Sequence, residues 1–214
     1  MELLDPVEIR VLGSLMEKEV TTPEYYPLSL NALVNACNQK SNRDPVVNYD
    51  EDTVADAADR LREKKLAILI TGSGRVNKFQ QRISETLNLG RRESAVLCTL
   101  LLRGPQTLGE IKDRSERMFA FADLTETETV LDKLADWPNG ALITKLPRQP
   151  GQKEARFAHL LSGTPAIATA AAGEPAAVEP PVGRVAQLEK DLHDLRAEFD
   201  ELKRRFETLE SQLR

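Results

Sequence analysis

The spacing of apolar residues predicts three helices in the first part of the chain. Asp5 followed by Pro6 is a typical helix start, and apolar positions recur from there at helical spacing to about Val20. Two further helices are predicted over residues 29–38 and from Asp50 onward. In each of them the apolar residues fall on one face, as in a helix that packs against a core.

The spacing then changes from helical to alternating. Residues 66–70 are predicted to form one strand and residues 76–83 a returning strand, joined by the turn Gly72-Ser73-Gly74. Three helices followed by a β-hairpin is the plan of a winged helix, in which the hairpin is the wing.

The same order of elements recurs in the second part of the chain. The segment VLCTLL at 96–101 aligns with VLGSLM at 11–16, and TVLD at 129–132 aligns with TVAD at 53–56. The repeat predicts a second set of elements: helices over 91–102, 107–118 and 125–137, and strands over 141–146 and 156–161.

This internal repeat indicates two tandem winged helices, residues 1–89 and 90–161. The expected fold class is therefore mainly α with small β-hairpins (α+β). In the second unit Thr107, with Glu110 three residues on, forms a capping box that marks the start of a helix.

The end of the chain has a different pattern. Residues 162–183 are rich in Ala and Pro, which predicts a linker, and residues 184–214 carry heptads that predict a coiled-coil helix. The a and d positions of these heptads are apolar throughout: Val185, Leu188, Leu192, Leu195, Phe199, Leu202, Phe206, Leu209 and Leu213.

The charges that flank the heptad seam favour a parallel pair of helices. In that arrangement Arg184 faces Glu189 and Glu198 faces Lys203, both attractive pairs. An antiparallel pair would instead bring Arg196 to Lys203, which repels. We therefore predict a parallel homodimer, with a monomeric helix that folds back on the winged helices as the alternative.

Composition and charge narrow the function classes. The chain has 214 residues, 41% hydrophobic residues and a net charge of −5, which gives no global attraction to nucleic acid. Cys37 and Cys98 lie far apart within apolar helical patterns, which predicts buried free thiols. The apolar pattern contains neither a signal peptide nor a membrane span, so we expect a cytoplasmic protein with no membrane partner.

The stretch over 21–49 combines a short apolar helix with a run of amide and basic side chains. Such a run is too polar for a core, so we expect it on a surface. Lys40 and Arg43 are the candidates there for contact with a ligand. Asn35 and Asn38 are assigned instead to capping helix ends and holding the turn that follows.

The charges of the third helices and of the wings differ. Readout of bases by a third helix in the major groove favours basic and amide side chains. Both third helices are acidic here, through Asp50, Glu51, Asp52, Asp56 and Asp59 in the first and Glu126, Glu128, Asp132 and Asp136 in the second.

Basic residues concentrate in the loops and wings: Lys40, Arg43, Arg75, Lys78, Arg82, Arg148, Lys153 and Arg156. Their contacts with phosphate would be independent of sequence and sensitive to salt. The alternative is a wing that is charged only for solubility or to protect the edge of its sheet.

The sequence offers little for catalysis. His159 and His193 are far apart, and no Ser, Cys or metal-ligating cluster lies at a productive spacing. The turn at Gly72-Ser73-Gly74 is not a phosphate loop, since no helix follows it. We expect a protein that is not an enzyme and that has no cofactor and no metal.

Three segments together resemble the bacterial YceH-like family of unknown function. They are TTPEYYPLSLNALVNACNQKSNRDPV at 21–46, LLRGPQTLGEI at 101–111, and the closing wing with its heptad tail. The resemblance covers about residues 5–161 and the architecture of the tail. It implies a cytoplasmic protein of tandem winged helices, and it implies no reaction and no ligand.

Two function classes follow. In the first, a dimeric DNA-associated or transcription-regulatory protein holds phosphate with its basic wings and the loop before the third helix. In the second, a protein-interaction adaptor docks a basic partner on its acidic third helices. The common use of the fold favours the first class, and this is an argument by analogy.

Overall fold

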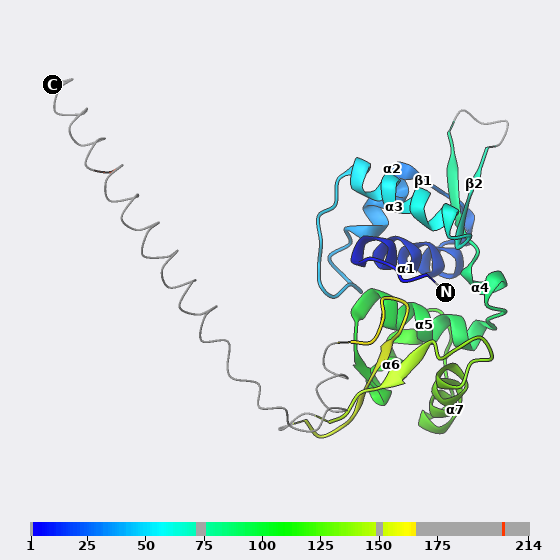
Figure 1. The fold of residues 1–214 in the computed structure, drawn as a ribbon, viewed down its shortest axis with the longest axis vertical. Helices are drawn as coiled ribbons and strands as arrows, with labels where there is room; N and C mark the ends of the chain where they lie inside the picture. Colours follow the sequence, from blue (N-terminus) through cyan, green and yellow to red (C-terminus); the bar gives the residue numbers. More distant parts are fainter. Residues whose placement is uncertain (1, 72–75, 149–151, 166–202, 204–214) are drawn as a thin grey trace. The chain divides into compact units, whose positions relative to one another are not determined.

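The computed structural model describes residues 2–71, 76–148, 152–165 and 203. The described residues up to 165 form a mixed α+β fold with small antiparallel sheets (Figure 1). The helices are α1 (Pro6–Thr21), α2 (Leu30–Cys37), α3 (Glu51–Glu63), α4 (Ile83–Thr86), α5 (Arg91–Arg103), α6 (Leu108–Ser115) and α7 (Leu124–Ala135), with a 3-10 turn at Pro23–Tyr25. The strands are β1 (Leu28–Ser29), β2 (Ala67–Ile70), β3 (Lys78–Gln81), β4 (Gln106–Thr107), β5 (Ile143–Lys145) and β6 (Arg156–His159).

The order of elements repeats. The sequence α1, β1, α2, α3, β2, β3 is followed by α5, β4, α6, α7, β5, β6. The two three-stranded sheets have the corresponding strand orders β1-β3-β2 and β4-β6-β5, all antiparallel. We call the elements from α1 to α4 the N-terminal half and those from α5 to β6 the C-terminal half.

The predicted helix starts are confirmed by their caps. The carboxylate of Asp5 accepts hydrogen bonds from the backbone N–H groups of Val7 and Glu8. The backbone N–H of Asp5 in turn donates to the carboxylate of Glu8, which completes a capping box. Thr107 and Glu110 form the predicted capping box of α6, whereas the box at Asp5 was predicted only as an N-cap. These side chains satisfy backbone N–H groups that have no partner inside a helix.

The returning strand of the first hairpin is shorter than predicted. It ends at Gln81, and Ile83 starts the short helix α4 with its side chain fully buried. The alternation that suggested a strand to residue 83 is therefore partly the start of a helical turn. Strands β1 and β4 were not predicted, because two residues are too few to show an alternating pattern.

Helices α1 and α5, which occupy corresponding places in the repeat, pack against each other and join the two halves in one core (Figure 1). A Cβ atom on Gly13 would lie 2.9 Å from Cδ2 of Leu102, so glycine permits the close approach of the two helices. Cys98 donates to the carbonyl of Gly13 at 3.3 Å. As a result α1 is buried on all sides, from Glu8 to Glu17.

The N-terminal segment also contacts the C-terminal half. The backbone N–H of Leu4 donates to the carbonyl of Leu161 at 2.8 Å. The described residues up to Pro165 thus belong to one compact unit.

The predicted linker falls largely, and the predicted coiled coil almost entirely, outside the described residues. None of the nine a and d positions predicted to form the dimer is among them. The parallel homodimer therefore stays a prediction.

Candidate binding surfaces

The exposed face of α3 is acidic. Asp52, Asp56, Asp59 and Glu63 follow one another at intervals of four, three and four residues, so they form one stripe along the helix. All four are exposed, and Arg62, the basic residue beside them, is paired with Asp59. The opposite face is buried in the core through Val54, Ala57, Ala58 and Leu61.

The exposed face of α7 has the same character. Glu128, Asp132 and Asp136 recur every four residues and are exposed. Lys133 does not neutralise these carboxylates, because its ammonium lies 2.6 Å from the carboxylate of Glu93 on α5. Helices α3 and α7 therefore both present carboxylates, which repel a phosphate backbone.

The fold separates the candidate basic residues of the first hairpin, β2 and β3. Lys78 is exposed on β3. Arg82 lies beyond the end of that strand and makes an exposed ion pair with Glu85 at 2.9 Å. Arg75 lies outside the described residues. Lys78 is thus the one candidate cation without a partner among the described residues of this hairpin.

The hairpin of β5 and β6 brings basic residues together. Lys145, Arg148 and Lys153 line one groove of about 700 Å³ beside the starts of α6 and α7. Its apolar lining includes Leu108, Leu124, Leu146 and Phe157. The ammonium of Lys145 lies 5.5 Å from the centre of the Phe157 ring, a cation–π contact.

Arg156 stabilises the fold around the hairpin of β5 and β6. Its guanidinium donates to the carbonyl of Pro105 at 2.8 Å and to the carboxylate of Glu110 at 3.0 Å. Glu110 is in turn the capping residue of α6. Arg156 therefore fixes the edge strand β4 and the helix start beside it, and it is already paired.

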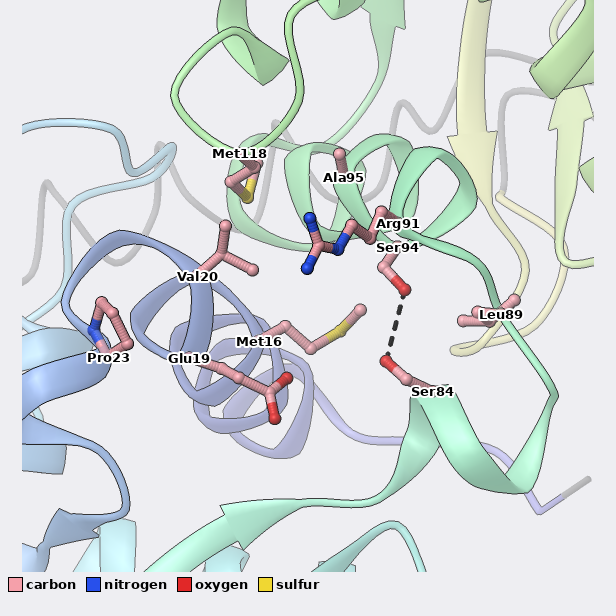
Figure 2. A pocket seen from close by; sticks show the side chains of 10 residues that line it. All are labelled: Met16, Glu19, Val20, Pro23, Ser84, Leu89, Arg91, Ser94, Ala95 and Met118. Atoms are coloured by element: carbon pink, nitrogen blue, oxygen red, sulfur yellow. Dashed lines mark hydrogen bonds between the residues drawn. The ribbon is translucent and has the colours of Figure 1, made fainter.

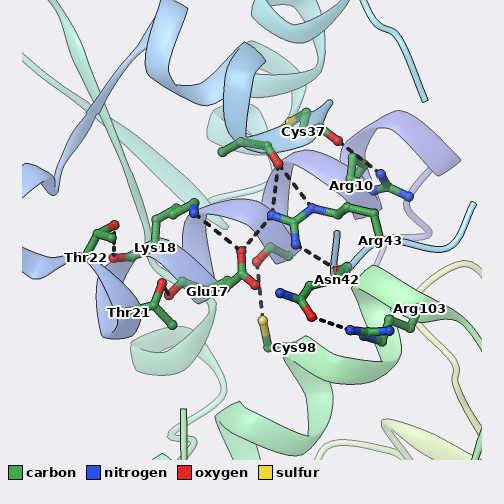
Figure 3. A network of polar contacts seen from close by, with 12 residues as sticks. Arg10, Glu17, Lys18, Thr21, Thr22, Cys37, Asn42, Arg43, Cys98 and Arg103 are labelled. Carbon is green, nitrogen blue, oxygen red and sulfur yellow. Dashed lines mark hydrogen bonds and ion pairs between the residues drawn. The ribbon is translucent and has the colours of Figure 1, made fainter. Parts of the chain in front are cut away.

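Arg43 is a structural residue, which corrects the expectation that it contacts a ligand. Its side chain is fully buried, and its guanidinium lies 2.7 Å from the carboxylate of Glu17 on α1 (Figure 3). It also donates to the carbonyls of Ala36 and Asn42. The sequence could not show this, because a polar run does not reveal which buried carbonyls require a donor.

Residues 38–49, which we call the clamp loop, are tied to both halves of the molecule. Asn38 exchanges two hydrogen bonds with the backbone of Tyr49, which confirms its structural assignment. The N–H of Asp44 donates to the carbonyl of Leu102, and Arg103 donates to the side chain of Asn42 (Figure 3).

A second arginine supports the clamp loop from α1. Arg10 is buried and donates to the carbonyls of Cys37 and Pro45. Burial lowers the pKa of its guanidinium, and the neighbouring Arg43 lowers it further. Lys40 remains exposed at the outside of the loop.

Sequence reasoning missed Arg10, Glu17 and Arg103 as parts of this network. Each is a charged residue within a strongly apolar helix, and a charge at such a position is a signal for a buried polar partner. Asn35 was assigned to the structure as a cap, but it is exposed and bonds only the side chain of Asn31.

Both cysteines are free and buried, as predicted. Burial raises the pKa of Cys37 to about 11, so its thiol stays protonated near neutral pH. Burial lowers the pKa of His159 to about 4, and the buried Nδ1 atom of this ring has no hydrogen-bond partner among the described residues. In the described part of the chain no three His, Cys, Asp or Glu side chains gather as a metal site.

A hollow of about 510 Å³ lies between α1, α4 and α5 (Figure 2). Its apolar walls include Met16, Val20, Leu89 and Met118. Four polar side chains line it as well: Glu19, Ser84, Arg91 and Ser94. No sequence pattern indicated this site, because its walls come from both halves of the chain.

Within the described ranges, no helix is both long enough and apolar enough to cross a membrane. The duplicated order of helices and hairpins defines a mixed α+β protein built from a repeat.

Comparison with known proteins gives the family. A family model described as "Protein of unknown function, DUF480" matches residues 4–152. A UPF0502 protein of Solibacter usitatus is 54% identical over 207 residues, which cover 95% of this chain and 98% of the relative. One from Opitutus terrae is 53% identical over 197 residues, with 92% and 84% covered.

The chain therefore belongs to the DUF480 family of proteins of unknown function, whose relatives carry the name UPF0502 protein. This confirms the resemblance to a bacterial family of unknown function. Neither name states an activity.

Proposed function

We propose that each half is a winged helix and that the protein is a non-enzymatic adaptor whose acidic third helices dock a basic partner. The winged-helix assignment is supported by the order helix, strand, helix, helix, hairpin in each half and by the matching strand orders of the two sheets. In this scheme residues 1–89 and 90–161 are the two modules. Helices α3 and α7 are their third helices.

The adaptor function rests on one observation, the exposed acidic stripe on α3 that is formed by Asp52, Asp56, Asp59 and Glu63. Carboxylates at a helix start favour the helix dipole, and this explains Asp52. It does not explain Asp59 and Glu63, which lie in the later turns of the helix. A stripe that continues along the whole exposed face is suited to a cationic surface.

The test compares two neutralised variants of the full chain as baits in a nuclease-treated cell extract. The first carries Asp52→Asn, Asp56→Asn and Glu63→Gln on the stripe. The matched control carries Glu2→Gln, Glu24→Gln and Glu116→Gln, which removes the same charge from exposed positions outside the stripe. None of these six side chains makes a hydrogen bond or ion pair with another described residue, so both variants are expected to fold.

A protein that is retained by the wild type and the control, and lost by the stripe variant, supports the adaptor. Since rim charges act mainly on association, raised salt should release the same protein. Equal retention by all three baits would overturn the proposal.

The second candidate is a DNA-associated or transcription-regulatory protein. It is favoured by the groove where Lys145, Arg148 and Lys153 meet beside the start of α7. Arg43 and Arg156 are left out of the phosphate-binding set, because Arg43 is buried against Glu17 and the part-exposed Arg156 is paired with Glu110. Lys40, Lys78, Arg82, Arg148 and Lys153 are its remaining described members, and Arg82 among them is paired with Glu85.

Binding of the full chain to duplex DNA over a salt series tests this candidate. If Lys78, Arg148 and Lys153 each neutralise a phosphate, replacing all three by Ala lowers the salt slope by about three. Absence of binding at low salt would exclude this candidate. The predicted dimer is tested separately, since light scattering should give a dimer for the full chain and a monomer for a chain ending near residue 183.

A further inference from the structure

The hollow between α1, α4 and α5 has the size and the lining of a small-molecule site. A volume of about 510 Å³ lies in the range of small-molecule sites. Its walls combine methionine and aliphatic side chains with a few polar groups, the usual make-up of such a site. Figure 2 shows these side chains converging from the two halves.

Arg91 supplies a cation to this hollow. It is the first residue of α5, and its side chain, which is exposed, extends along the hollow toward Val20 and Met118 (Figure 2). Its guanidinium has no hydrogen-bond or ion-pair partner among the described residues. The neighbouring Arg92 differs, since it is paired with Glu126 at 3.1 Å and lies over the ring of Phe119.

Glu19 supplies an anion to the same hollow. Its carboxylate accepts a hydrogen bond from the side chain of Gln81 at 2.6 Å and makes no ion pair with Arg91. Burial raises the pKa of Glu19, which indicates that its carboxylate is poorly solvated and would gain from a cationic partner. The hydroxyls of Ser84 and Ser94 lie 3.3 Å apart nearby and can donate or accept.

We propose that this hollow binds a small zwitterion with an apolar body, of the class of a hydrophobic α-amino acid. The carboxylate of the ligand pairs with Arg91, its ammonium pairs with Glu19, and its side chain lies against Met16 and Met118. A molecule with both charges satisfies two groups of the hollow that do not pair with each other. A ligand with only one charge leaves one of them without a partner.

The experiment is a calorimetric titration of the full chain with L-phenylalanine, in parallel with phenylalaninamide and 3-phenylpropionate. The first analogue lacks the carboxylate and the second lacks the ammonium. We expect each analogue to bind at least about tenfold more weakly than phenylalanine, since a charge-assisted hydrogen bond contributes about 1.5–3 kcal/mol and each 1.4 kcal/mol is tenfold.

Variants assign the site. Arg91→Ala and Glu19→Gln should each weaken phenylalanine binding at least about tenfold, and Arg92→Ala should leave it unchanged. Glu19→Gln keeps an oxygen that can accept from Gln81, so the fold is preserved. Val20→Trp, at a position 48% exposed on the wall of the hollow, should fill the space and abolish binding without disturbing the core.

The results decide the proposal either way. Binding that is lost in Arg91→Ala, Glu19→Gln and Val20→Trp and kept in Arg92→Ala supports it. No binding of phenylalanine at millimolar concentration overturns it, and so does binding that Arg91→Ala and Glu19→Gln leave unchanged.

Discussion

The two halves share an order of elements but join their second and third helices in different ways. In the N-terminal half the clamp loop is long and polar, and Arg43, Asn38 and Arg10 hold it. In the C-terminal half residues 116–123 are fixed by aromatic packing. Phe121 is buried, and its ring centre lies 4.9 Å from that of Phe119.

The difference shows what the polar run does. The carbonyls of Ala36 and Cys37, at the end of α2, accept hydrogen bonds from Arg43 and Arg10. The last carbonyls of a helix lack partners inside the helix, and cations are favoured at that end. A segment that resembles a binding surface in sequence is thus largely an internal cap and a tie between the halves.

Substitution of Arg43, which pairs with Glu17, is the most direct way to weaken the hold of the clamp loop. Arg43→Ala removes the close partner of the buried Glu17 carboxylate and leaves it only the longer ion pair with Lys18, at 3.9 Å. We therefore expect the free energy of unfolding to fall by about 3–5 kcal/mol. Denaturant unfolding measures this. The control Arg82→Ala removes an exposed pair with Glu85 and should cost less than about 1 kcal/mol. A loss at Arg43 no larger than at Arg82 would contradict the clamp.

Acid should lower the stability of the C-terminal half through protonation of His159. Its pKa is about 4 in the folded protein and about 6.5 when unfolded, so the unfolded state takes up the proton first as pH falls. Stability is then lost between about pH 6.5 and 4, by up to about 3 kcal/mol.

His159→Leu removes the titrating group and serves as the comparison for this acid effect. Unfolding followed at several pH values should show a smaller loss for this variant than for the wild type. Parallel pH profiles for the two proteins would exclude His159 as the cause.

The close packing of α1 against α5, which joins the two halves, is tested by a substitution at Gly13. A Cβ atom there would meet Leu102 at 2.9 Å, so Gly13→Ala should destabilise the fold by about 1–3 kcal/mol despite the better helix propensity of alanine. Gly109 on α6 has open space around it, and Gly109→Ala should be neutral or stabilising. Thermal unfolding of both variants gives the contrast, which fails if Gly13→Ala is also stabilising.

The smallest effect is expected within the clamp loop itself. Asn38→Ala removes two hydrogen bonds to the backbone of Tyr49, at a cost of about 1–2 kcal/mol. Asn35→Ala removes only an exposed bond to Asn31 and should change stability by about 0.5 kcal/mol or less. Equal effects of the two substitutions would mean that Tyr49 is held by other contacts.

Much of the fold could be predicted from the sequence because local signals mark it. The N-cap residue Asp5 marks one helix start, and the capping box of Thr107 marks another. The residue pattern around Leu69 and Phe79 indicates the hairpin. The burial of α1 on all sides could not be predicted, since Gly13 meets Leu102 and Cys98 from a helix distant in sequence.

The candidate site residues were harder to predict than the fold. A lysine or arginine in a loop has the same sequence signal whether it faces solvent, as Lys40 does, or a buried carbonyl, as Arg43 does. The hollow that Arg91 and Glu19 line requires α1 and α5 to be in place before it exists. Local patterns specify elements, whereas these sites depend on contacts between elements.

Hydrogen exchange at the amide of Asp44 tests the clamp most directly. This N–H donates to the carbonyl of Leu102 across the two halves, at 2.9 Å. The clamp predicts that it exchanges as slowly as core amides of α5 such as that of Leu100, and that Arg43→Ala speeds it selectively. Exchange of Asp44 in the wild type at the rate of the exposed Lys40 would show that the loop is not tied to the C-terminal half.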